Sequence, residues 1–167
     1  MKKALVTVIY DNSRPVGSEI KQITGKRSFG EAVFKRKTLR ERTEELLKGI
    51  ETVGSFADRE TIPAPGPTEQ RPVFVLFSDF MIRDRRAVEI LLEKCCYADE
   101  PYRVLMQDAA DGERCCAALY PSLSSYLETD EEALLGCDII RTEAFIDISN
   151  IGNFRQFITS GFDARFF

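Results

Sequence analysis

Continuous runs of apolar and β-branched residues recur along the chain and predict the strands of a buried sheet. The runs at 4–10 (A-L-V-T-V-I-Y) and 73–77 (V-F-V-L-F) lack a strict apolar–polar alternation, which is typical of strands buried on both faces. Shorter runs predict further strands at residues 102–106, 114–120, 137–140 and 144–148. The sheet is therefore expected to lie inside the protein.

Between these runs, apolar residues recur at helical spacing. Thr38 and Glu41 form the S/T-x-x-E pattern of a capping box, and the apolar positions from Leu39 to Ile50 fall on one helical face. Further helices are expected from about residue 84, over 122–128, from 129 to 135 and over 151–160. Residues 19–37 have no clear period.

Strands that alternate with helices predict an α/β fold. We expect a three-layer sandwich with a mostly parallel central sheet, Rossmann-like in plan. Residues 1–167 are expected to form a single domain, with an exposed Pro-rich loop at 57–70. The stretch from Thr38 to Val73 looks too short for a second strand and a helix after it.

Loops that follow strands are the places where such a sheet binds ligands, because the crevice lies beyond the carboxyl ends of the strands. Three loops meet this condition, at 11–18, 78–82 and 147–150. We expect them to surround one crevice.

Composition removes several kinds of chemistry. The chain has no histidine, so zinc sites of the usual type and Ser-His or Cys-His dyads are excluded. A formal charge of −4 argues against nucleic acid and anionic membranes as partners. No apolar run approaches the ~20 residues of a membrane span, and the five cysteines lack metal-type spacing. We expect a cytoplasmic protein with reduced thiols.

Two aspartates end predicted strands, Asp79 in L-F-S-D-F and Asp147 in F-I-D-I. Two carboxylates that meet at one edge of a sheet repel each other unless a cation joins them. Mg²⁺ takes one or two carboxylates together with phosphate oxygens and water. The pair therefore suggests Mg²⁺ and a nucleotide. The alternative is that each aspartate caps the turn or helix that follows it.

The loop after the first run reads N-S-R-P-V-G, with Ser13, Arg14 and Gly17, and Lys21 follows. This segment resembles the G-x-S-R-x-x-G loop and following lysine of nucleotidyltransferases with a GT-A-like fold. That superfamily includes sugar-nucleotide pyrophosphorylases and the guanylyltransferases of molybdenum-cofactor synthesis. The resemblance implies that Ser13, Arg14 and Gly17 bind nucleotide phosphates and that Lys21 is a catalytic lysine.

A second segment offers an alternative match to the same loop. It is T-G-K-R-S-F-G at 24–30, with Lys35 or Lys37 as the lysine. The segment K-T-L-R-E-R, from Lys37 to Arg42, resembles the start of the helix that follows this loop in the family.

The last third of the chain carries the clearer resemblance. C-A-A-L-Y-P-S-L-S-S-Y-L resembles a strand and helix of the molybdenum-cofactor guanylyltransferases. A-F-I-D-I-S-N, from Ala144 to Asn150, resembles the W-x-D-x-G-H segment of bacterial capsule-type sugar nucleotidyltransferases. By this resemblance Asp147 and Asp79 are the metal ligands. The closing S-G-F-D-A-R-F-F is similar to a junction with a choline-kinase-like domain, so the chain is expected to be the front part of a longer protein.

The resemblance implies a nucleotidyltransferase that transfers a nucleotidyl group from an NTP to a sugar phosphate or phosphocholine-like acceptor in cell-surface polysaccharide synthesis. Three departures support the alternative of a degenerate, non-catalytic module: Asp11 and Asn12 replace glycines, Ser149-Asn150 replaces G-H, and the chain is short. A more remote alternative is a TIR-like NAD-processing domain, with Glu89 as its glutamate.

Overall fold

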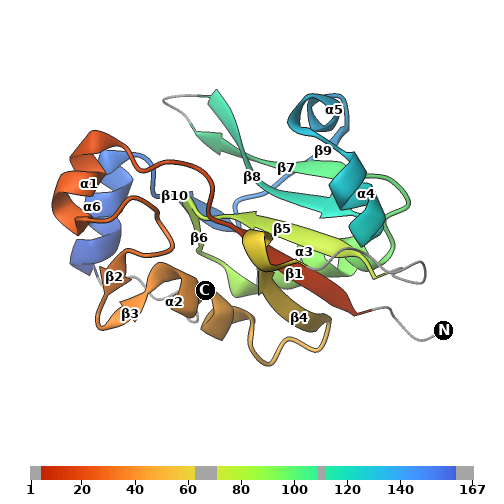
Figure 1. The fold of residues 1–167 in the computed structure, drawn as a ribbon, viewed down its shortest axis with the longest axis horizontal. Coiled ribbons are helices and arrows are strands. Elements are labelled where there is room, and N and C mark those ends of the chain that lie inside the picture. The colour runs from red at the N-terminus through yellow and green to blue at the C-terminus, as the bar shows by residue number, and fades with distance from the viewer. Residues whose placement is uncertain (1–4, 63–70, 109–111, 161–167) are drawn as a thin grey trace.

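The computed structural model describes residues 5–62, 71–108 and 112–160 (Figure 1). A six-stranded sheet forms the centre of the molecule. Its strands, in spatial order, are β4 (Val53–Asp58), β1 (Val6–Asp11), β5 (Val73–Phe77), β8 (Gly112–Tyr120), β7 (Tyr102–Asp108) and β9 (Asp138–Arg141).

The strands of this sheet point the same way with one exception. β1 is parallel to β4 and β5, and β7 is parallel to β9. β8 alone is antiparallel, to β5 on one side and to β7 on the other. The prediction of a mostly parallel sheet is therefore confirmed, although β8 runs against its neighbours.

Helices cover both faces of the sheet and complete the predicted three-layer sandwich. One face packs against α2 (Leu39–Leu47) and α3 (Arg85–Cys96), with Val8, Phe74 and Leu92 in the shared core. The opposite face, with Ile9 and Val75, packs against α4 (Leu123–Glu128), and α5 (Glu131–Leu135) lies beside it (Figure 1). Successive residues of β1 thus point to opposite faces, as the strand geometry requires.

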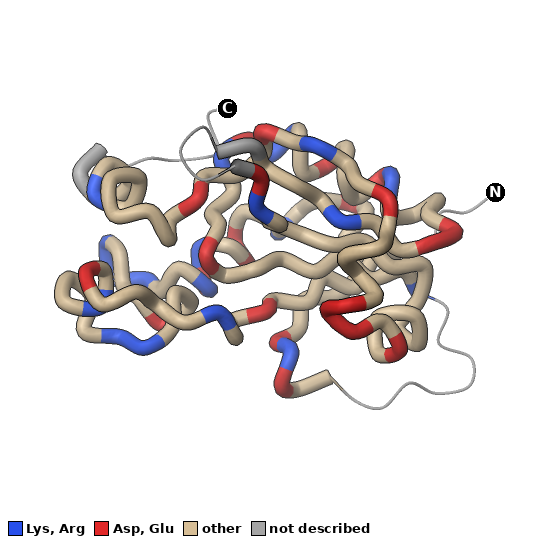
Figure 2. Tube along the Cα trace, turned by 90° about the horizontal axis from the view of Figure 1, so that it is seen from above, with Lys and Arg blue, Asp and Glu red and all other residues tan. Residues whose placement is uncertain are grey.

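A second apolar cluster holds a smaller lobe together at one end of the sheet (Figure 1). Its elements are α1 (Ser18–Thr24), α6 (Ile151–Ser160), the hairpin of β2 (Val33–Phe34) and β3 (Lys37–Thr38), and the antiparallel pair of β6 (Phe80–Ile82) and β10 (Phe145–Asp147). Figure 2 shows Lys and Arg distributed over this lobe.

Local signals explain where the helices begin. Thr38 and Glu41 form both hydrogen bonds of the predicted capping box at the start of α2. The side chain of Asp84 caps α3 by accepting hydrogen bonds from the backbone N–H groups of Arg86 and Ala87. Among the described residues no helix is long and apolar enough to cross a membrane.

Two expectations for residues 38–73 are corrected. A second strand, β4, does fit there: it follows α2 and pairs in parallel with β1 at the edge of the sheet. The predicted loop at 57–70 begins later than expected, because β4 extends to Asp58 and a 3₁₀ helix, η1, spans Arg59–Thr61. The Pro-rich residues 63–70 lie outside the described residues.

Candidate functional site

The first loop is shaped by the side chain of Asp11, at the end of β1. Asp11 is buried, and its Oδ1 accepts hydrogen bonds from the backbone N–H (2.9 Å) and the hydroxyl of Ser13. The Nε of Arg59 lies 3.9 Å from Asp11 Oδ2. The negative charge of Asp11 raises the pKa of Arg59. The carboxylate therefore fixes the turn in a place where the family pattern has glycine.

A neighbouring segment is joined to this loop. The backbone N–H of Gly30 donates to Asn12 Oδ1 (2.9 Å), and Pro15 forms an isolated antiparallel bridge with Ser28. A Cβ at Gly30 would lie 2.8 Å from Asn12 Nδ2 and 2.9 Å from the buried ring of Tyr10, so the close packing here favours glycine. Both segments that matched the family's loop therefore lie side by side.

Gly17 has a different environment. It is the N-cap of α1 with φ −64°, and a Cβ added there would meet nothing within 4 Å. Neither the backbone conformation nor a close contact requires glycine at this position.

The side chain of Arg14 extends from the loop toward Asp79 and β8. Its Nη1 donates to Asp79 Oδ1 (3.0 Å) and to the backbone oxygen of Cys115 (2.8 Å). Its guanidinium carbon lies 3.9 Å from the centroid of the Phe77 ring. Three separate contacts, from β5, the turn after it and β8, therefore hold this side chain in one position.

The register of two short strands brings Asp79 and Asp147 together. Asp147 of β10 is paired with Phe80 of β6, the residue after Asp79, and the backbone N–H of Ile148 donates to Asp79 O (2.9 Å). Both aspartates are about 1% exposed. Hence the loops at 78–82 and 147–150 meet, and Arg14 ties the loop at 11–18 to them.

A second arginine lies between the two carboxylates. Arg114, on β8, donates from Nη2 to Asp79 Oδ2 (2.7 Å) and from Nη1 to Asp147 Oδ2 (2.6 Å). Burial lowers the pKa of Arg114, but the hydrogen bonds to the two carboxylates and their negative charges together raise it, and the net shift is upward. The cation that electrostatics requires between this pair is therefore a guanidinium of the chain itself.

The two residues that replace G-H of the family pattern have structural partners. Ser149 donates from its N–H (2.9 Å) and hydroxyl (2.6 Å) to Asp147 Oδ1, and its Oγ accepts from Arg114 (2.6 Å). Asn150 Oδ1 accepts from the N–H of Asn153, in the first turn of α6 (3.1 Å). Ser149 thus belongs to the charged cluster, while Asn150 stabilises the start of a helix.

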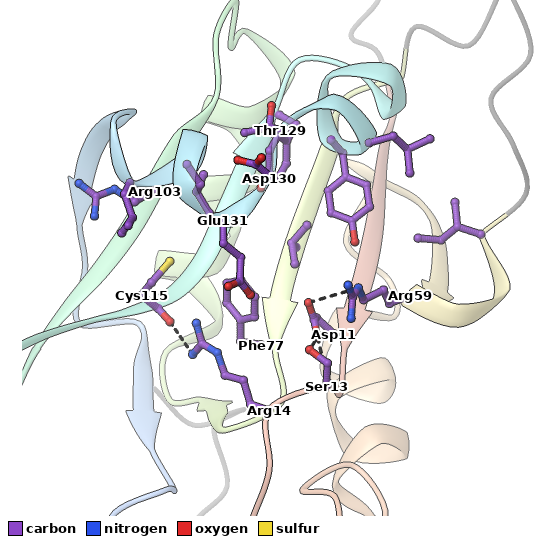
Figure 3. A pocket seen from close by; sticks show the side chains of 17 residues that line it. Asp11, Ser13, Arg14, Arg59, Phe77, Arg103, Cys115, Thr129, Asp130 and Glu131 are labelled. Carbon is purple, nitrogen blue, oxygen red and sulfur yellow. Dashed lines mark hydrogen bonds and ion pairs between the residues drawn. The ribbon is translucent and has the colours of Figure 1, made fainter.

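A cavity of about 780 Å³ opens beside this cluster, between the sheet and α4 and α5. Figure 3 shows Arg14 and Phe77 at one side of it, Asp11 opposite Arg59 at another, and Glu131 reaching in from α5. Its volume is within the range of small-molecule sites. Its remaining lining includes Tyr120, Tyr126, Thr129 and Asp130.

The cysteine thiol that lines this cavity does not have the lowered pKa of a nucleophile. Cys115 lines the cavity, but burial raises the pKa of its thiol although the charge of Arg14 lowers it. A reactive cysteine needs a lowered pKa. All five cysteines are free, as the sequence predicted.

The predicted lysines lie apart from this cluster. Lys21 is exposed on α1, and Lys35 is exposed at the tip of the β2–β3 hairpin with φ 51°. Within the part of the chain that the structure describes, Asp79 and Asp147 form their ion pairs with Arg14 and Arg114 and not with either lysine. Of the predicted site residues, the structure thus brings Arg14 and Asp79 into contact and Arg114 links Asp79 to Asp147, while Ser13 lines the same cavity as Arg14 and Gly17 lies at the start of α1.

Glu89, the basis of the TIR-like alternative, has an ordinary helical partner. It lies on α3 and forms an ion pair with Arg85 one turn earlier, with 3.7 Å between Glu89 Oε1 and Arg85 Nη1. It does not line the cavity.

Sequence reasoning missed the residues that complete the site. The sequence pattern does not mark Arg114 or Arg59 as site residues, and it marks Asp11 only as the replacement of a glycine. The available signal for Arg114 is a pair of charged residues, Glu113 and Arg114, near the start of a strand that is otherwise mostly apolar, G-E-R-C-C-A-A-L-Y. Its meaning depended on the direction of β8, which the sequence does not show.

Comparisons with known proteins bear on the fold. No family model and no curated protein sequence matches the chain. Among solved structures, a protein named as a glucose-1-phosphate thymidylyltransferase from Bacillus anthracis matches with a TM-score of 0.56 and 10% identity, over 95% of this chain and 96% of that one. UDP-glucose pyrophosphorylase from Acinetobacter baumannii matches with a TM-score of 0.60 and 7% identity, over 93% of each chain.

A third similar structure is 4-diphosphocytidyl-2C-methyl-D-erythritol synthase from Anaerococcus prevotii, with a TM-score of 0.55 and 10% identity over 95% of this chain and 98% of that one. The chain has the fold of the nucleotidyltransferases. At 7–10% identity the likeness concerns the fold, and the function must be argued from the site.

Within this nucleotidyltransferase fold, the donor chemistry of the aspartate pair suits Mg²⁺. No cluster of three or more His, Cys, Asp or Glu occurs within residues 5–62, 71–108 and 112–160 that could hold a metal alone. Asp79 and Asp147 would supply two carboxylates, which is the number that Mg²⁺ commonly takes from protein when phosphate and water supply the rest. A cation can bind both carboxylates only if Arg114 breaks its hydrogen bonds to Asp79 and Asp147.

Proposed function

We propose that the protein transfers a nucleotidyl group from an NTP to a small phosphorylated acceptor. The observation that carries this proposal is the position of Arg14. One face of its guanidinium lies on Phe77 at the cavity, and its N–H groups reach the buried carboxylate of Asp79. A ligand in the cavity would therefore have its anionic end against a fixed cation, next to a cluster suited to phosphate and Mg²⁺.

The cavity suits a nucleoside. Phe77 and Tyr126, both half-buried, offer aromatic surface for a base, while Asp130 and Glu131 offer acceptors for amino groups or ribose hydroxyls. One similar structure is named as a glucose-1-phosphate thymidylyltransferase and another as a UDP-glucose pyrophosphorylase, which supports the same class of reaction here.

The phosphates would bind at the mouth of the cavity. Arg14 presents a planar guanidinium there, and Ser13 is exposed in the same loop. Asp79 and Asp147 would hold Mg²⁺, which when bound neutralises charge on the phosphates and lets an acceptor phosphate approach. The chain's own contribution is to orient the phosphates and keep their charge balanced, with no covalent intermediate.

For the acceptor we propose a sugar phosphate or a phosphocholine-like compound, in cell-surface polysaccharide synthesis. Its support is the similarity of Ala144–Asn150 to the capsule-type enzymes. The linked kinase-like domain also stays a proposal, because residues 161–167, which suggested it, lie outside the described residues.

The test is a pyrophosphate-release assay with each NTP, Mg²⁺ and a panel of sugar 1-phosphates and phosphocholine. Asp79→Asn and Asp147→Asn are expected to abolish release, whereas Glu143→Gln, at an exposed position, is the matched control. Activity that survives both aspartate substitutions would refute this site.

One observation favours a second candidate, a non-catalytic binding module with a regulatory or scaffolding role. The four carboxylate oxygens of Asp79 and Asp147 already accept hydrogen bonds from the chain, so the cluster is complete without a metal. Calorimetry with Mg²⁺-NTPs separates the candidates. Binding without pyrophosphate release supports a nucleotide-sensing module, and the absence of both heat and thermal stabilisation supports a scaffold.

A further inference from the structure

Arg114 and Arg14 balance the charge of the aspartate cluster. The two carboxylates are 1–2% exposed at their side chains, and each arginine side chain is 29% exposed. Two guanidinium charges face two carboxylate charges. The cluster is therefore neutral, and neither carboxylate is buried without a partner.

Every carboxylate oxygen of the pair is engaged. Asp79 accepts from Arg14 at Oδ1 and from Arg114 at Oδ2. Asp147 accepts from Ser149 at Oδ1 and from Arg114 at Oδ2. A divalent cation needs carboxylate lone pairs at roughly 2.1 Å, and a guanidinium left beside it would repel it. A cation that is to join both carboxylates must therefore displace Arg114.

We propose that Arg114 is the resident counter-ion of the Asp79–Asp147 pair, and that it excludes free divalent cations from this pair. The two carboxylates become available to a cation only when a polyphosphate binds the Arg114 guanidinium and draws it away. A guanidinium pairs with phosphate oxygens as well as with carboxylate oxygens. The partial exposure of Arg114 gives its side chain a path toward solvent. The identity of the polyphosphate rests on the proposed function, whereas the exclusion of free cations does not.

The experiment uses cations alone, without nucleotide. Wild-type protein, Arg114→Gln and Arg114→Lys are titrated with MnCl₂ and MgCl₂ by calorimetry and by thermal melting. The Gln variant removes the charge but keeps an amide that can bond to one carboxylate. It is expected to bind Mn²⁺ at least about tenfold more tightly than the wild type, with a matching rise in melting temperature.

A double variant and the Lys variant keep the test decisive. Arg114→Gln combined with Asp147→Asn should lose the new binding, which assigns the cation to this pair. Arg114→Lys keeps the charge on one nitrogen that cannot bridge both carboxylates, so its Mn²⁺ affinity should lie between those of the wild type and the Gln variant. If the Gln variant does not fold, a Lys variant indistinguishable from wild type refutes the proposal.

The release step is tested with Mg²⁺ and inorganic tripolyphosphate. The wild-type melting temperature should rise with the two together and with neither alone. A rise with Mg²⁺ alone that Asp147→Asn abolishes would overturn the exclusion, and no rise with the two together would overturn the release. Since no nucleotide is present, these outcomes are independent of the pyrophosphate-release assay.

Discussion

Replacing Arg14 by lysine tests whether the guanidinium geometry, rather than its charge alone, holds the site together. The guanidinium bonds to Asp79 and to the Cys115 carbonyl and lies over Phe77. An ammonium group keeps the charge but cannot make all three contacts. Losing one hydrogen bond to a charged group costs about 1.5–3 kcal/mol. Losing a partly exposed cation–π contact costs about 0.5–1 kcal/mol more.

With allowance for the 29% exposure of Arg14, we expect Arg14→Lys to lower the free energy of unfolding by about 2–3 kcal/mol. For a chain of this size that corresponds to a fall in melting temperature of about 4–12 °C. Urea denaturation at constant m-value measures the change, with Arg155→Lys, at an exposed position of α6, as the control. A loss below about 0.5 kcal/mol would refute the fixed position of Arg14.

Three further changes test the architecture. Thr38→Ala removes the capping box of α2 and should cost about 1 kcal/mol in urea denaturation. Gly30→Ala should cost about 1–3 kcal/mol because its Cβ would clash, while Gly17→Ala should leave stability unchanged or slightly higher; equal effects would contradict the loop geometry. Burial raises the pKa of Cys95 to about 12 and that of Cys116 in the same direction. Their contribution to stability is complete below about pH 9 and is lost as pH rises toward 12, so urea midpoints should fall from pH 9 upward.

The sheet was largely predictable where strands are buried on both faces. The run V-F-V-L-F gives β5 with the same bounds in sequence and structure, because complete burial leaves an uninterrupted apolar signal. β4 was missed because an edge strand is only half covered. Its sequence V-G-S-F-A-D exposes Gly54 and Ser55, and its pairing with β1 depends on contacts far apart in the chain.

The candidate site was predictable in part. Each aspartate lies at or just after the end of a buried run, which the sequence shows, and the pairing of β6 with β10 then brings them together. Their need for a cation follows from electrostatics. The position of Lys21 and Lys35 was not predictable, since it depends on how the lobe of α1 and the hairpin folds. The asparagine and serine that replace G-H were read as losses, yet Ser149 bonds to both Asp147 and Arg114.

The direction of one strand explains why the sequence does not indicate Arg114 as a site residue. In a wholly parallel sheet, the first residues of a strand lie at the edge opposite the carboxyl ends, away from the ligand crevice. β8 is antiparallel, with Ala117 paired to Leu76 of β5, so its first residues extend past the carboxyl end of β5. Arg114 therefore lies at the same edge of the sheet as Asp79, although it is near the start of its strand. The reversal of a single strand thus places one positive charge between two carboxylates that come from other segments of the chain.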